Sequence, residues 1–169
     1  AFKDCDRLSF FLGPHAPYTC DEEYLKIVAS EAKKENMGIH IHLAESLSEM
    51  EGCAKTYHCT PIELAARCGL FDVPAIAAHC VNVNDADLDI LKEKNVSVVT
   101  NPASNMKLGN GFAPVAKMLE KGINVCLGTD GAASNNSLNM FHEMNLLALI
   151  HKGTAKVPQC VSAKEAIQI

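Results

Sequence analysis

Histidine and acidic residues recur in this sequence directly after short apolar runs. Five of them fit this description: His15, His42, Glu45, His79 and Asp130. Imidazole and carboxylate groups bind divalent metals and transfer protons near neutral pH. Each has an ordinary structural explanation, since Asp130 precedes a glycine as turn residues do and Glu45 could cap a helix. Five such groups after successive runs favour a functional site over five separate coincidences.

The segments that would position these groups alternate between strand and helix patterns. Strands are predicted over 8–12, 39–44, 75–80, 96–100 and 124–129. Helices are predicted over 22–36, 46–55, 60–68, 84–94, 114–121 and 138–151, with a loop over 101–111. This alternation predicts an α/β domain with a parallel sheet, whose strands carry sites at their carboxyl ends.

The alternation inside the second predicted strand indicates which face is buried. Ile39, Ile41 and Leu43 fall on one face, as packing against helices requires, while His40 and His42 share the other. No G-x-G-x-x-G follows the first strand, which weakens a dinucleotide-binding interpretation. Periodicity alone does not choose between an open doubly wound sheet and an arc of a barrel. The length of 169 residues predicts a single domain over 1–169.

Composition narrows the class of partner. The net charge is −5 and the longest basic run is Lys33-Lys34, so nucleic acid is not expected as a partner. No apolar stretch is long enough for a membrane span, and no signal peptide is visible. The eight cysteines, Cys5 among them, form no C-x-x-C pair. We expect them to be reduced, buried side chains in a cytoplasmic protein.

Five segments carry a resemblance to a known family. They are residues 13–18 (GPHAPY), 40–45 (HIHLAE), 78–80 (AHC), 101–109 (NPASNMKLG) and 128–136 (GTDGAASNN). Together they resemble the amidohydrolase superfamily, in the branch of the 5-methylthioadenosine/S-adenosylhomocysteine deaminases, beside the chlorohydrolases and guanine deaminases. The last segment is specific, whereas an isolated His-x-His would be weak. The resemblance covers nearly the whole chain.

This resemblance implies a partial TIM-like (β/α)₈ barrel, about strands 4 to 8 with their helices. It also implies one divalent metal, zinc in the first place, with iron and manganese as alternatives. By analogy, His42 and Asp130 are metal ligands, Asp130 also accepts a proton, Glu45 shuttles protons, and His79 orients the attacking hydroxide. His15, Ser104 and Asn105 are expected to bind substrate. His58, His142 and His151 are expected to be non-catalytic.

The chain departs from the family pattern in one respect. The family takes two further ligands from a His-x-His on the first barrel strand, and this chain begins at what would be the fourth. We therefore expect a fragment of a metal-dependent aminohydrolase. The whole enzyme is expected to deaminate an adenosine-type nucleoside, methylthioadenosine or adenosylhomocysteine, through a metal-bound hydroxide. The fragment alone is expected to be inactive. The open barrel edges predict a homo-oligomer or another edge-to-edge association.

Two alternatives stay open. One is a related amidohydrolase, such as a guanine or cytosine deaminase or a chlorohydrolase. The other is a non-catalytic α/β domain that retains the motifs as remnants.

Overall fold

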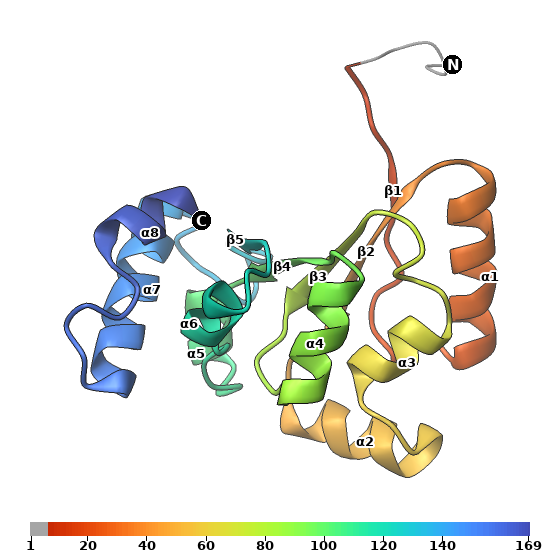
Figure 1. Ribbon diagram of the computed structural model, residues 1–169, viewed down its shortest axis with the longest axis horizontal. Helices are drawn as coiled ribbons and strands as arrows, with labels where there is room; N and C mark the ends of the chain where they lie inside the picture. Colours follow the sequence, from red (N-terminus) through yellow and green to blue (C-terminus); the bar gives the residue numbers. More distant parts are fainter. Residues whose placement is uncertain (1–6) are drawn as a thin grey trace.

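Five parallel strands form one sheet in the computed structural model, which describes residues 7–169 (Figure 1). The strands are β1 (Phe11–Leu12), β2 (Gly38–Leu43), β3 (Ala75–His79), β4 (Ser97–Thr100) and β5 (Val125–Leu127). The helices are α1 (Glu22–Lys34), α2 (Leu47–Tyr57), α3 (Pro61–Arg67), α4 (Asp85–Glu93), α5 (Pro102–Lys107), α6 (Val115–Glu120), α7 (Met140–Ala155) and α8 (Ala163–Gln168).

The strand order decides which α/β architecture is present. Neighbours in the sheet follow the chain, β1-β2-β3-β4-β5, and every pair is parallel. A doubly wound sheet reverses its order at a switch point, whereas a (β/α)₈ barrel keeps its strands in sequence. The predicted partial barrel is therefore confirmed as an arc. In Figure 1, α1 lies at the β1 end of the arc and α7 and α8 lie at the β5 end.

The two faces of the sheet differ in burial as the alternation predicts. Ile39, Ile41 and Leu43 are fully buried, while His40 is exposed and His42 half-buried. The apolar face meets helical side chains that are also fully buried, among them Leu25, Ile62, Leu64, Leu88, Leu91 and Met118. Burying a side chain of this size contributes about 1.5–3 kcal/mol, so the helix-facing layer holds the arc together.

Local signals set where several helices begin. Asp21 and Asn84 accept hydrogen bonds from backbone N–H groups as N-caps of α1 and α4. Thr60 caps α3 and forms a capping box with Glu63, with Pro61 at the first helical position. The expected starts of these three helices agree with the structure.

The structure differs from the expected elements in three places. Residues 102–107 form the helix α5, where the sequence predicts a loop. The helix α8, which the sequence analysis does not predict, follows α7. The N–H of Ala103 in α5 donates to Glu143 of α7 at 3.0 Å, so a residue distant in sequence completes this helix start. The first strand contracts to Phe11–Leu12, which pairs with β2.

Two further properties are the state of the cysteines and the length and apolarity of the helices. The described cysteines, from Cys20 to Cys160, are free thiols, and Cys5 lies outside the described residues. None of the described helices combines the length and apolarity that a bilayer crossing requires.

Candidate metal centre

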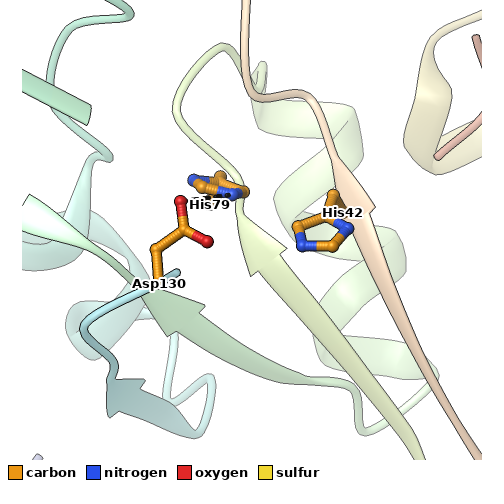
Figure 2. Close-up of side chains that lie close together, drawn as sticks. All are labelled: His42, His79 and Asp130. Atoms are coloured by element: carbon orange, nitrogen blue, oxygen red, sulfur yellow. Dashed lines mark ion pairs between the residues drawn. The ribbon is translucent and has the colours of Figure 1, made fainter. Parts of the chain in front are cut away.

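Three potential metal ligands from separate parts of the sheet meet at the carboxyl ends of the strands. His42 belongs to β2, His79 ends β3, and Asp130 lies in the loop after β5 (Figure 2). One ligand atom from each lies within 4.8 Å of the other two. Parallel register produces this proximity, since His42 pairs with Ala78 and Leu43 pairs with His79.

The orientation of the His42 ring is fixed by a main-chain carbonyl. Its Nδ1 lies 2.7 Å from the carbonyl oxygen of His15, and its backbone N–H donates to the same oxygen at 3.0 Å. Because a carbonyl only accepts, Nδ1 carries the ring proton. In the neutral imidazole Nε2 then has the free lone pair, which is the form that binds a metal.

Three donors hold the Asp130 carboxylate. The hydroxyls of Ser104 and Ser134 donate to Oδ2 at 2.6 and 2.8 Å, and the N–H of Gly131 donates to Oδ1 at 2.7 Å. Burial by itself would raise the pKa of Asp130, but these hydrogen bonds outweigh it and lower the pKa. Asp130 is thus an oriented anion at neutral pH.

His79 is the most buried member of the group, with 1% of its surface exposed. Its Nδ1 lies 2.8 Å from Oδ1 of Asn105, which is also buried. With Nδ1 occupied in this way, Nε2 faces two carboxylates, Glu45 at 3.9 Å and Asp130 at 4.0 Å. This nitrogen is therefore placed between the two acids of the site.

The side chain of Glu45 reaches the same space from the end of β2. Nδ2 of Asn110 donates to its Oε1 at 3.0 Å, and Nδ2 of Asn82 donates to its backbone carbonyl at 2.8 Å. Glu45 lies three residues beyond His42, so one strand end supplies both a potential ligand and a carboxylate.

His15 lies at the exposed rim of the site. Its ring meets the rings of His42 and Tyr18 edge to face, with centroids 5.2 and 5.4 Å apart. Its Nδ1 lies 2.8 Å from the hydroxyl of Thr19. A side chain held in this way is accessible to a bound molecule without being part of the buried cluster.

The backbone of this rim is strained. Ala44, His79, Cys80 and Asp130 have positive φ values of 53°, 72°, 47° and 58°, although none is glycine. Each left-handed residue costs roughly 1–2 kcal/mol. Strain of this kind persists where the surrounding structure enforces it, and it concentrates at functional sites.

The structure places every predicted site residue at this edge, but in two layers. His15, His42, Glu45, His79 and Asp130 border the common space. Ser104 and Asn105 are buried beneath it, bonded to Asp130 and His79, so their expected contact with substrate stays a prediction.

Several residues that support the site were not predicted from the sequence. Asn82, Asn110, Ser134 and Glu49 each bond to a site residue or its backbone. Only Ser134 lay in a segment singled out by the motifs.

The donor set fits a divalent metal. His42 offers an imidazole nitrogen and Asp130 a carboxylate oxygen, and zinc takes both kinds of ligand. With a ring nitrogen of His79 they lie within 4.8 Å of one another, so the three groups border one common space.

Comparisons with known proteins show the family of this chain. A sequence model of the amidohydrolase family matches residues 6–169. The 5-methylthioadenosine/S-adenosylhomocysteine deaminase of Dictyoglomus thermophilum is 52% identical over 161 residues, which is 95% of this chain and 38% of that protein. The chain thus spans well under half the length of this relative.

Solved structures share the fold. A zinc-bound adenosine deaminase from Xanthomonas campestris superposes with a TM-score of 0.92 at 32% identity, covering 98% of this chain and 38% of that one. A guanine deaminase from C. acetobutylicum, with guanine in its active site, gives a TM-score of 0.85 at 28% identity, covering 90% of this chain and 38% of that one.

Proposed function

The chain belongs to the amidohydrolase family, and we propose that it forms part of a metal-dependent aminohydrolase that deaminates adenosine-type nucleosides by hydrolysis. One observation carries the proposal. The potential ligands His42, His79 and Asp130 converge within 4.8 Å at the edge where a barrel places its active site. The 52% identity to a methylthioadenosine/adenosylhomocysteine deaminase supports this substrate class.

His42 and Asp130 are proposed to hold one divalent metal, zinc by analogy with the zinc-bound relative, with iron and manganese as alternatives. When bound, such a metal supplies a Lewis acid that makes hydroxide available from water near neutral pH. The free Nε2 of His42 and the oriented anion of Asp130 suit this role.

The proton transfers are assigned to side chains of this chain. Water adds to the ring carbon that bears the amino group, and Asp130 accepts the proton that the water loses. Glu45 gives its proton to the adjacent ring nitrogen, then takes the remaining proton from the added hydroxyl as the C=O bond forms and passes it to the amine, so that the C–N bond breaks and ammonia leaves. The proton held by Asp130 then returns to Glu45, which restores both carboxyl groups. His79 orients the attacking oxygen through Nε2, which faces both carboxylates.

Substrate contacts are proposed at the rim. His15 is exposed beside His42 and is suited to bind a ribose hydroxyl. Ser104 and Asn105 are proposed to act near the same substrate, although in this chain their side chains bond to Asp130 and His79.

The remainder of the site is proposed to come from outside these residues. The chain covers 38% of its deaminase relative, and a catalytic zinc usually takes three protein ligands. We propose that further ligands, and the part of the substrate site that grips the rest of the nucleoside, are contributed by chain that docks against the open edges of the arc. The 169 residues alone are then inactive.

A second candidate is deamination of a free purine base. The superposition on a guanine deaminase at 28% identity favours this second reaction. The 52% identity to a methylthioadenosine/adenosylhomocysteine deaminase is higher and favours a nucleoside as the substrate.

The test is ammonia release by the protein expressed in its full-length reading frame and loaded with zinc. Methylthioadenosine, adenosylhomocysteine and guanine are supplied in parallel. Turnover of the nucleosides above that of guanine supports the proposal, and turnover of guanine alone supports the second candidate. A metal-loaded protein that turns over none of these three compounds contradicts both.

A further inference from the structure

Glu49 differs from the acids that occupy the same position in other helices. In α3, α4 and α8 the third residue is acidic and its carboxylate accepts from the backbone N–H of the N-cap residue. Glu49 stands third in α2 behind the N-cap Ser46. Its carboxylate reaches beyond Ser46 and accepts from the N–H groups of Ala44 at 3.0 Å and Glu45 at 2.8 Å. Helix capping alone does not account for this placement.

The two N–H groups belong to the turn in which the chain leaves β2. Ala44 is fully buried and adopts a left-handed conformation with φ of 53°. Successive N–H groups at such a turn form a concave anion-binding site, which the Glu49 carboxylate fills from within the chain. Each carboxylate oxygen takes one N–H, so both oxygens are committed.

The same turn carries Glu45, whose other groups are also held. Asn82 bonds to its carbonyl and Asn110 bonds to Oε1 of its carboxylate. Oε2 remains toward Nε2 of His79, at 3.9 Å. Glu49 supplies the remaining restraint, on the N–H of Glu45.

Glu49 is 4% exposed, and a buried carboxylate is costly unless hydrogen bonds offset its desolvation. An apolar residue facing the core would avoid that cost but would leave two N–H groups unpaired. The carboxylate therefore has a specific task at this turn.

We infer that Glu49 is a positioning residue, whose buried carboxylate fixes the left-handed turn at Ala44 and thereby aims the carboxylate of Glu45 at the reacting centre. This inference rests on the proposed function, in which Glu45 moves protons. A displacement of about an ångström in such a group can lower the rate about 10²-fold.

The test is Glu49→Gln in the full-length protein. The two N–H groups meet different oxygens of the carboxylate, so glutamine in the same position sets its amide oxygen against one N–H and its NH₂ against the other, donor against donor. We expect kcat for nucleoside deamination to fall roughly 10- to 100-fold, with KM and zinc content nearly unchanged.

A matched control is Glu63→Gln, the same change at the same position of α3. There a single oxygen, Oε2, accepts from Thr60 N–H at 2.7 Å, and glutamine can keep that bond. Its kcat should stay at the level of the unmodified protein.

A double-mutant cycle separates positioning from general destabilisation. If Glu49 acts through Glu45, then Glu49→Gln lowers kcat in the unmodified protein but not in the Glu45→Gln background. An equal loss in both backgrounds, or a kcat that matches the Glu63→Gln control, overturns the inference.

Amide hydrogen exchange tests the same inference without turnover. In the unmodified protein the amides of Ala44 and Glu45 should exchange as slowly as those of β2, and Glu49→Asp, which shortens the reach while keeping the charge, should speed their exchange selectively. Fast exchange at both amides in the unmodified protein overturns the inference even where Glu49→Gln does not fold. A protein with these slow amides but no deaminase activity contradicts the proposed function and leaves the positioning of the turn in place.

Discussion

The hydroxyl of Ser104 is expected to control metal affinity through Asp130. It is fully buried and donates to Oδ2 of Asp130 at 2.6 Å. A hydroxyl-to-carboxylate bond of this length is charge-assisted and among the stronger hydrogen bonds in proteins. Ser104→Ala removes it without adding bulk.

The expected loss of zinc affinity depends on the hydrogen bonds that Asp130 keeps in the Ser104→Ala variant. Changes to residues that hold a ligand typically cost 10- to 100-fold in metal affinity, which is about 1.4–2.7 kcal/mol. Ser134 still donates to the same oxygen at 2.8 Å, and Gly131 N–H still donates to the other. We therefore expect a loss of about tenfold for Ser104→Ala and about 100-fold when Ser134→Ala is added.

The assay is zinc competition against a chromophoric chelator at fixed pH, on the full-length protein. Ser137→Ala serves as the control, since Ser137 is exposed in the same loop and its hydroxyl bonds to none of the residues from 7 to 169. A Ser104→Ala variant that binds zinc as tightly as Ser137→Ala would refute the view that this hydroxyl orients the ligand.

Glu45→Gln, which keeps shape but cannot cycle a proton, should lower kcat by roughly 10²–10⁴-fold with metal content unchanged, and a near-normal kcat would remove Glu45 from the mechanism. His151 is buried, and burial and Lys152 lower its pKa below 6.5. As the pH falls, the unfolded chain therefore takes up the proton before the folded chain does. Urea unfolding should show the free energy of unfolding falling as the pH drops below about 6.5, and His151→Gln should make it depend less on pH. An unchanged pH dependence in His151→Gln would contradict this. Among residues 7–169 no further strand pairs with the outer edges of β1 and β5, so sedimentation of the isolated chain should show self-association, and a stable compact monomer would contradict this.

Strand faces and strand ends could be predicted from the sequence because both depend on neighbouring residues. The alternation of Ile39, Ile41 and Leu43 with His40 and His42 has the period of a strand, and the buried face follows directly. Parallel strands then bring their carboxyl ends to one edge, so His42, His79 and Asp130 could be expected near one another before any coordinates.

The supporting contacts could not be predicted because they join residues far apart in the chain. Ser104 reaches Asp130, Asn110 reaches Glu45, and Glu143 completes the start of α5 at Ala103. Nothing near any of these residues in the sequence indicates its partner.

The contacts of Glu49 could not be predicted for a different reason. Ser46 and Glu49 have the spacing of an ordinary capping box, but in the folded chain the carboxylate reaches beyond the cap to Ala44 and Glu45. The left-handed backbone of Ala44 likewise has no sequence signal, because alanine does not favour it.

The central claim is that this chain carries metal-binding and proton-transfer groups of a nucleoside deaminase. The most direct measurement compares ammonia release from methylthioadenosine by the zinc-loaded full-length protein, its His42→Ala variant and its His142→Ala variant. His142 is exposed on α7, so His142→Ala should retain turnover, while His42→Ala should lose both turnover and bound zinc. Turnover and bound zinc that survive His42→Ala would contradict the account.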